Sequence, residues 1–350
     1  MTKVRGLVLE RLNKPPRLHE IDVLPPGPGE VSVRMHAAGL CHTDLSNVRD
    51  ARTTPLLLGH EGAGVVESVG DGVEGLEPGM EVLVCWKVPC GSCRQCSAGR
   101  LHLCERVQEL SGPRFFWDGK PLPPLLNAGC FSELIVLSAA GAIPLDGGLP
   151  LEQAALVGFA VATGVGAVLK TAQVEPGARV AVWGAGGVGL NAVSAARLAE
   201  ASTIVAIDPD PVRRELALAR GATDAVTPEE AADVAVDLDY AFEVVGEPEV
   251  MATALSALGD GGTLVLVGAA ARDALLEFHP RAFMSKQQRI VGCIYGSLHP
   301  HSDLPELLRW CANGRLPLED LVGRRISLDE LPAAFVEPPT DGVRTIVTFE

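Results

Sequence analysis

The first 150 residues carry short runs of strand-forming residues separated by turns rich in proline and glycine. Val31–Met35 and Gly64–Gly70 are two such runs. Short strands at close spacing, joined by Pro-Gly turns, are typical of compact sheets and barrels. This part of the chain is therefore expected to form a β-rich, barrel-like domain.

The hydrophobic pattern changes after Pro150. Leu151–Leu169 is long, apolar and rich in small residues, which predicts a buried helix or helix pair. From Arg179 onward, short apolar runs alternate with helical stretches, and this rhythm predicts βαβ units whose helices cover a parallel sheet. The expected strands are Val180–Trp183, Thr203–Ile207, Tyr240–Val245, Thr263–Val267 and Arg289–Ile294, and the expected helices are Val188–Ala199, Val212–Arg220 and Glu249–Leu258.

The last part of the chain adds one helix and one strand. The helix is expected at Asp303–Ala312, and the tail Gly342–Phe349 has the pattern of a closing strand. Because such a strand could rejoin the β-rich domain, that domain is expected to be discontinuous. The sequence thus predicts an α/β protein with a first domain at 1–155, a parallel-sheet domain at 156–294 and a C-terminal part at 295–350 that returns to the first domain.

Composition fits this picture and limits the possible partners. The chain has 350 residues, more than one typical domain, with 47% hydrophobic residues and 38 glycines. Its formal charge is 29 − 44 = −15, which argues against nucleic acid or an anionic membrane as a partner, because both attract basic patches. The sequence has no run of about 18 or more apolar residues and no apolar signal-peptide core. We therefore expect a cytoplasmic protein without a membrane span.

Four of the nine cysteines cluster within fifteen residues. Cys90, Cys93, Cys96 and Cys104 give the spacing C-x2-C-x2-C-x7-C. Four thiolates in a short, turn-rich lobe predict a closed tetrahedral zinc site with a structural role. An iron–sulfur cluster is the alternative, because three cysteines at two-residue gaps also occur in such sites.

A glycine-rich motif lies between an expected strand and an expected helix. Gly184-Ala185-Gly186-Gly187-Val188-Gly189 matches G-x-G-x-x-G and directly follows the strand. In this context the glycines allow a tight turn and let the backbone approach a pyrophosphate at the helix N-terminus. Asp208, at the end of the next strand, can accept hydrogen bonds from ribose hydroxyls, and Asp210 adds to the repulsion of a 2′-phosphate. The motif therefore predicts a dinucleotide site that takes NAD(H) rather than NADP(H).

Cys41 and His60 form a possible reactive pair in the β-rich domain. A thiolate and an imidazole are both good zinc ligands. Three polar residues follow Cys41 directly, and Glu61 follows His60 among glycines. A buried run would not normally concentrate such groups, so the pair indicates a functional site.

In the order and spacing of these motifs, the sequence resembles the zinc-containing medium-chain alcohol dehydrogenases over nearly its whole length. The residues that carry the resemblance are Gly39–Asp44, Gly59–Gly64, the four-cysteine lobe, Gly184–Gly189 with Asp208, and Arg344. The resemblance implies a GroES-like catalytic domain built from both ends of the chain. It also implies a Rossmann domain, with a doubly wound parallel sheet, between those ends. The implied cofactors are NAD, a structural zinc and a catalytic zinc bound by Cys41 and His60.

The resemblance implies roles for further residues. Thr43 matches the hydroxyl residue that relays the proton of the substrate, and Asp44 matches the acid that orients the histidine ligand. The implied cofactor contacts, beside the glycine motif and Asp208, are His42, Thr163, Arg213, Val267 and Arg344. The implied substrate pocket contains Trp86, Leu125, Leu126 and Phe159.

Two positions depart from the family pattern. Ser46 stands where some members carry a histidine that passes the relayed proton to solvent, and a serine or a water chain can substitute for it. Phe159 stands where the family usually has a third, cysteine ligand, and a phenyl ring cannot bind zinc. Glu61 is the candidate replacement, because a carboxylate is an ordinary zinc ligand. The alternative is an empty or weakly occupied catalytic zinc site.

The expected function is NAD(H)-dependent interconversion of an alcohol and an aldehyde or ketone by zinc-assisted hydride transfer. A reductase of an activated C=C or C=N bond without catalytic zinc is the alternative, because such acceptors depend less on a metal. A catalytically silent NAD-binding protein is the third hypothesis. The resemblance further implies a small-molecule substrate and a homodimer, with a tetramer as the alternative.

Overall fold

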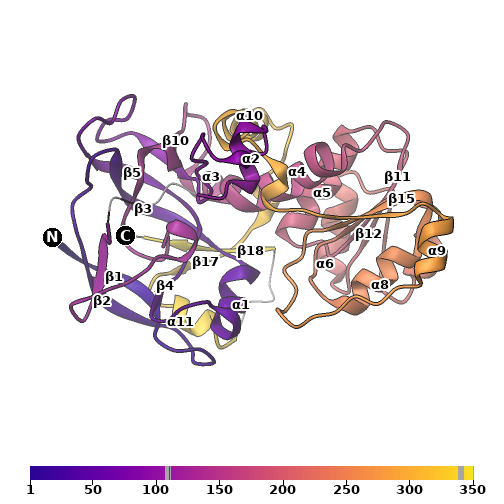
Figure 1. Cartoon of the computed structure of the whole chain (residues 1–350), viewed down its shortest axis with the longest axis horizontal. Coiled ribbons are helices and arrows are strands. Elements are labelled where there is room, and N and C mark those ends of the chain that lie inside the picture. The colour runs from indigo at the N-terminus through magenta and orange to yellow at the C-terminus, as the bar shows by residue number, and fades with distance from the viewer. Residues whose placement is uncertain (107–109, 111, 338–342, 350) are drawn as a thin grey trace. The chain divides into compact units, whose positions relative to one another are not determined.

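The computed structural model of the chain describes residues 1–106, 110, 112–337 and 343–349, which fall into two compact units (Figure 1). Unit 1 is Met1–Phe159 with His299–Glu350, and unit 2 is Ala160–Leu298. The boundaries expected from the sequence, 155/156 and 294/295, each lie four residues before the boundaries of these units.

Unit 1 is built on two sheets. The first has the strand order β4-β1-β2-β7-β8, with β1 at Thr2–Leu9, β2 at Arg17–Val23, β4 at Leu56–Leu57, β7 at Phe115–Trp117 and β8 at Lys120–Pro121. The second has the order β10-β6-β5-β3-β18-β17, and β9 also pairs with β3. Its strands are β3 Glu30–Leu40, β5 Glu61–Val69, β6 Glu81–Val84, β9 Leu134–Ser138, β10 Ala142–Pro144, β17 Val322–Ser327 and β18 Arg344–Thr348. The β-rich character expected for the first 150 residues is confirmed.

Strand β18 joins the late part of the chain to the early part. It pairs antiparallel with β3, from Thr345 opposite Leu40 to Thr348 opposite Ala37. Of the expected tail strand, Gly342 lies outside the described residues. The pairing places Arg344 next to the end of β3, where the chain turns into Cys41.

Unit 2 contains a six-stranded parallel sheet with the order β13-β12-β11-β14-β15-β16. Its strands are β11 Arg179–Trp183, β12 Thr203–Ile207, β13 Asp224–Val226, β14 Leu238–Glu243, β15 Leu258–Leu266 and β16 Arg289–Gly292. Numbered along the chain, this is the order 3-2-1-4-5-6 of a doubly wound Rossmann sheet. The order reverses between β11 and β14, and ligands of such sheets bind outside the carboxyl ends of the strands at that point.

Helices cover the sheet of unit 2 (Figure 1). Helix α5, Gly187–Leu198, packs on β11 and β12, and α6, Pro211–Ala219, packs on β12 and β13. Helix α8, Pro248–Ser256, packs on β14 and β15. The βαβ units predicted from the alternating pattern are therefore present.

Some predicted bounds were wrong. Strand β14 ends at Glu243 rather than Val245, because the chain turns at Gly246, whose φ is +95°. The short strand β13 and the short helix α9, Pro280–Ser285, were not predicted, since neither is long enough to show a period. Helix α10 spans Pro300–Ala312 and begins three residues earlier than expected.

The apolar segment after Pro150 forms one continuous helical stretch, Leu151–Ala172. Among the described residues, this is the one helix that is long and apolar enough, by length and composition, to cross a membrane. About 78% of its apolar window is buried inside the protein, as in a core helix. The stretch includes a π-helical turn at Val157–Val161 (η4).

Candidate active site and metal sites

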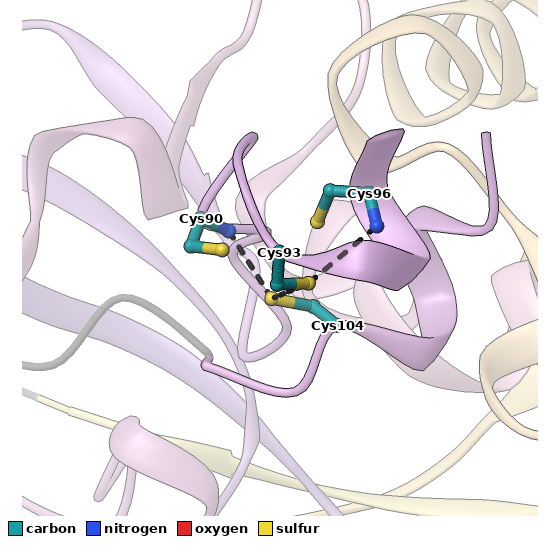
Figure 2. Close-up of side chains that lie close together, drawn as sticks. All are labelled: Cys90, Cys93, Cys96 and Cys104. Atoms are coloured by element: carbon teal, nitrogen blue, oxygen red, sulfur yellow. Dashed lines mark hydrogen bonds between the residues drawn. The ribbon is translucent and has the colours of Figure 1, made fainter. Parts of the chain in front are cut away.

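The four clustered cysteines of unit 1 lie together in a lobe after β6. Figure 2 shows the side chains of Cys90, Cys93, Cys96 and Cys104. Their sulfur atoms all lie within 4.8 Å of one another. The sulfur atoms of Cys93 and Cys104 are 3.9 Å apart, too far for a disulfide. Four thiols gathered in this way fit a closed, tetrahedral metal site.

The protonation of these thiols shows why the lobe suits a cation. Hydrogen bonds, the strongest from the backbone N–H of Ser92, lower the pKa of Cys90 to about 6. Burial, together with the neighbouring thiols, raises the pKa of Cys96 to about 12. Four thiolates would not coexist in so small a lobe without a positive ion, because like charges oppose ionisation. A bound divalent ion would displace the remaining protons.

A second cluster is organised by helix α1, His42–Asp50. Cys41 is the residue that precedes this helix, and Asp44 in its first turn accepts a hydrogen bond from the backbone N–H of Cys41 at 3.1 Å. Asp44 also accepts one from the backbone N–H of Gly59 at 3.2 Å. One buried carboxylate therefore holds the start of α1 next to the segment that leads into β5.

His60 lies between this carboxylate and the thiol. Its Nδ1 is 3.0 Å from Oδ1 of Asp44, and both side chains are completely buried. Its Nε2 has no hydrogen-bond partner among the described residues. Burial opposes the charged imidazolium, but Asp44 and then Cys41 outweigh it and hold the pKa of His60 well above its usual range. A histidine that gives its Nδ1 proton to a carboxylate presents Nε2 as a metal ligand.

Glu61 completes the cluster. Ligand atoms of Cys41, His60 and Glu61 lie within 4.8 Å of one another, and all three residues are buried. Oε1 of Glu61 is 3.3 Å from Nη2 of Arg344, the first residue of β18. A Cβ at Gly39 would lie 2.4 Å from Oε2 of Glu61, so a larger residue there would displace this carboxylate. A thiol, an imidazole and a carboxylate are a donor set that fits zinc.

Arg344 adds a positive charge to this cluster. Burial disfavours its charge, but its interactions with Glu61 and Cys41 outweigh burial and raise the pKa of the Arg344 guanidinium above its usual value. The guanidinium therefore stays protonated and balances the charge of Glu61.

The ring of Phe159 contacts His60 from the side. The two ring centroids are 4.6 Å apart, with 80° between the planes. Trp86, which follows β6, lies 6.2 Å from Phe159 at 44°. The other expected pocket residues, Leu125 and Leu126, lie on the short turn Leu125–Asn127 (η2), where Leu125 is buried.

The remaining expected residues of unit 1 lie on α1. Thr43 is half-buried, and its carbonyl accepts hydrogen bonds from the Ser46 hydroxyl at 3.1 Å and the Asn47 amide at 2.8 Å. His42 is exposed on the first turn. These side chains share one helix with Asp44, next to the Cys41 cluster.

The glycine motif of unit 2 turns from β11 into α5. Gly184 has a φ of +94°, which favours glycine, and a Cβ at Gly189 would lie 1.8 Å from the carbonyl oxygen of Gly184. A Cβ at Gly186 would meet no atom within 4 Å. Gly184 and Gly189 are thus required by the fold, whereas the space beside Gly186 is open for a ligand phosphate.

Asp208 stabilises this turn by hydrogen bonds. Its Oδ2 accepts a hydrogen bond from the backbone N–H of Ala185 at 2.8 Å, and its Oδ1 accepts one from the N–H of Asp210 at 2.9 Å. Arg213 forms ion pairs with Asp208 at 3.9 Å and with Asp210 at 3.5 Å. Each oxygen of Asp208 keeps acceptor capacity for a ribose hydroxyl, because a carboxylate oxygen has two lone pairs.

Val267 and Thr163 are the two further residues of unit 2 that were expected to contact the cofactor. Val267 follows β15, and its N–H donates to the carbonyl of Glu243 at 2.8 Å. Thr163 lies on α4, Ala162–Gly166, and its buried hydroxyl has no hydrogen-bond partner among the described residues.

Sequence reasoning missed Glu243, a fully buried acid at the end of β14. Its Oε1 accepts hydrogen bonds from the N–H groups of Val245 and Gly246 at 2.8 and 2.7 Å. Its Oε2 has no hydrogen-bond partner in the described structure. Burial raises the pKa of Glu243. The sequence offered one signal for this residue, because Glu243 is an acid inside the apolar run that follows Tyr240.

Family models of known proteins match parts of both units. The model of the alcohol dehydrogenase GroES-like domain matches residues 27–147, and the model of the zinc-binding dehydrogenase matches residues 187–313. S-(hydroxymethyl)glutathione dehydrogenase of Escherichia coli O1:K1 / APEC is 36% identical over 370 residues, which cover 99% of this chain and 100% of that protein.

Solved structures show the same likeness. An alcohol dehydrogenase zinc-binding domain protein from Burkholderia ambifaria has a TM-score of 0.91 and 31% identity, covering 100% of this chain and 99% of that one. Benzyl alcohol dehydrogenase from Acinetobacter calcoaceticus has a TM-score of 0.90 and 28% identity, with 100% of each chain covered. With both family models and a full-length relative matched, the chain is an enzyme that belongs to the zinc-containing medium-chain alcohol dehydrogenase family.

Proposed function

We propose that this enzyme is an NAD(H)-dependent oxidoreductase that interconverts an alcohol and an aldehyde or ketone, with a catalytic zinc held by Cys41, His60 and Glu61. The observation that carries the proposal is the buried Nε2 of His60, which has no hydrogen-bond partner among the described residues and lies with a thiol and a carboxylate within 4.8 Å. A bound zinc ion would polarise the substrate oxygen, and NAD would take or return the hydride.

The residues of the chain then have distinct roles. Asp44 keeps the Nδ1 proton of His60 in place, so that Nε2 stays available. Arg344 neutralises Glu61 from one side. The hydroxyl of Thr43 relays the proton of the substrate alcohol. Ser46, whose hydroxyl donates to the carbonyl of Thr43 at 3.1 Å, stands where some family members carry the histidine that passes this proton to solvent. The family resemblance supports these last two roles.

The cofactor is proposed to bind unit 2 at the carboxyl ends of β11 and β12. Gly184, Gly186, Gly187, Val188 and Gly189 would hold the pyrophosphate, and Asp208 would accept the ribose hydroxyls. Asp208 and Asp210 favour NAD over NADP, because both would repel a 2′-phosphate. The further cofactor contacts that the resemblance supports are His42, Thr163, Arg213, Val267 and Arg344. The four-cysteine lobe is proposed to hold a structural zinc.

Elemental analysis tests both metal sites. About two zinc ions per chain are expected. Cys41→Ser should remove one of them and Cys104→Ser the other, whereas Cys293→Ser is the matched control, because its sulfur lies in unit 2 and accepts a hydrogen bond from Thr171. Zinc near one per chain that is lost entirely with Cys104→Ser would exclude the catalytic zinc. Turnover is followed as NADH formation with a panel of alcohols.

One observation favours the second candidate, a reductase of an activated C=C or C=N bond without catalytic zinc. Phe159 takes the place of a third thiolate and contacts His60 directly. An activated acceptor depends less on charge stabilisation by a metal, which is typically worth several kcal/mol. This candidate requires that turnover be unchanged in Cys41→Ser, whereas the leading proposal requires its loss.

We also propose a homodimer that forms through the edge of the unit-2 sheet. Strand β16 is an edge strand, and apolar side chains in the flanking segments are exposed, including Leu275 at 78% and Met284 at 70%. Light scattering should give the mass of two chains for the wild type and of one chain for Met284→Glu. Leu12→Glu, an exposed apolar site of unit 1, is the control. A wild-type mass of four chains would show a tetramer in place of the proposed dimer.

A further inference from the structure

Three rings form a row in unit 1, with Phe159 in the middle. Phe159 is edge-on to His60 at 4.6 Å between centroids, and it is tilted by 44° to Trp86 at 6.2 Å. Both distances lie in the range at which aromatic rings attract each other. Trp86 is buried, whereas Phe159 is only half-buried, so part of the phenyl ring is left for another group.

The backbone fixes Phe159 in this position. The residue lies at the centre of the π-helical turn Val157–Val161, and such turns frequently occur at functional sites. A Cβ at Gly158 would lie 2.8 Å from the carbonyl oxygen of Val84, so the helix approaches the end of β6 as closely as only glycine allows. Trp86 is two residues beyond Val84. The close approach therefore places Phe159 beside Trp86 by backbone packing.

The row of rings borders the proposed reaction centre. Nε2 of His60 is buried without a hydrogen-bond partner among the described residues, and His60 is the residue that Phe159 contacts. If the oxygen of the substrate reacts next to His60, the group attached to the reacting carbon lies towards the phenyl ring of Phe159. A planar π-system can meet Phe159 edge-to-face or offset, whereas a saturated ring of equal size gains only apolar contact.

We propose that Phe159 and Trp86 are specificity-determining residues that select substrates with an aromatic group attached directly to the reacting carbon. The inference rests on the proposed oxidoreductase function and names its substrate class, aryl-methyl alcohols and aryl aldehydes. An aryl substituent also stabilises the positive charge that develops on carbon when a hydride leaves. Such a substrate suits a site in which a phenyl ring replaces one thiolate.

The test compares two alcohols with equal carbon skeletons, benzyl alcohol and cyclohexylmethanol, with the zinc-loaded enzyme and NAD. The ratio of their kcat/KM values is measured in the wild type, Phe159→Leu and Trp86→Leu. Each substitution should lower the ratio by about 2- to 12-fold, the value of one aromatic contact. Phe159→Tyr should keep the ratio. Trp117→Leu is the control, because Trp117 forms a comparable ring pair with His19, at 4.6 Å and 49°, in the same unit.

Two outcomes overturn the proposal: an unchanged ratio in both leucine variants, or a wild type that prefers cyclohexylmethanol. Zinc content, measured in parallel, should stay constant, which separates loss of selectivity from loss of the metal. If no alcohol is oxidised, the proposed function fails instead. Saturation-transfer NMR with the same two alcohols then measures their affinities, and equal affinities in the wild type would also overturn the proposal.

Discussion

Asp44 and His60 form a completely buried pair, with 3.0 Å between the carboxylate Oδ1 and the imidazole Nδ1. The same carboxylate accepts the backbone N–H groups of Cys41 and Gly59. One acid thus holds the ring of His60 and the backbone of two separate segments, at Cys41 and at Gly59. The availability of Nε2 for a metal depends on this pair.

Asp44→Asn should weaken zinc binding at the Cys41 cluster by about 10- to 100-fold, the usual effect of losing a partner of a histidine ligand. An amide cannot accept all three hydrogen bonds, because its NH2 group only donates. Competition with a chelator measures the affinity. Asp71→Asn, an exposed acid of unit 1, makes the same charge change as a control. Equal affinity in Asp44→Asn and the wild type would contradict the prediction.

Phe159→Cys should increase zinc retention at the Cys41 cluster, because a thiolate joins the donors at the side of His60 now contacted by the phenyl ring. Glu61→Gln should decrease zinc retention, and the double variant Phe159→Cys/Glu61→Gln should recover it. Because Glu61→Gln leaves Arg344 without its ion pair, thermal unfolding is measured to confirm that the variant folds. Full zinc content in Glu61→Gln would show that Glu61 is not a ligand.

Two glycine substitutions separate folding from cofactor binding in unit 2. Gly189→Ala places a Cβ 1.8 Å from the carbonyl oxygen of Gly184 and should destabilise the unit by about 1–3 kcal/mol, as overpacking does. Gly186→Ala meets no protein atom within 4 Å, so stability should be unchanged while NADH binding weakens. Thermal unfolding and NADH fluorescence titration measure the two effects. Normal NADH affinity in Gly186→Ala would place the pyrophosphate elsewhere.

Glu243→Gln should flatten the pH dependence of stability. Burial raises the pKa of Glu243 in the folded chain above its ordinary value of 4.5, so the folded state holds this proton more tightly than the unfolded state. The resulting stability is present below pH 4.5 and is lost as the pH rises through the raised pKa. Chemical unfolding at several pH values from 4 to 8 measures the slope, which should be smaller in the variant. An equal slope in both proteins would contradict a raised pKa.

The sequence predicted most of unit 2 because its signals are local. The alternation of strands and helices after Arg179 follows from apolar periodicity, and the turn at Gly184 follows from the motif itself. Strand β13 and helix α9 were missed because three and six residues carry no measurable period. The extension of β14 to Val245 was predicted wrongly, since an apolar run does not reveal where the backbone turns.

The candidate site was predictable as a set of residue types but not as a set of contacts. Cys41, His60 and Glu61 stand in recognisable motifs. The ion pair of Glu61 with Arg344 and the contact of Phe159 with His60 join segments far apart in the chain. Such contacts depend on the pairing of β18 with β3 and on the approach of Gly158 to β6, which no local pattern encodes.

The position of Arg344 on β18 has a consequence for the order of synthesis. Ribosomes make the chain from its N-terminus, so Glu61 emerges long before Arg344, the cation of its ion pair. Until β18 arrives, the last four residues of β3 keep one edge open. A nascent chain therefore carries Glu61 without its ion-pair partner beside an unfinished sheet. Maturation of the site must wait for the arrival of β18, unless a metal ion captured early takes the place of the missing charge.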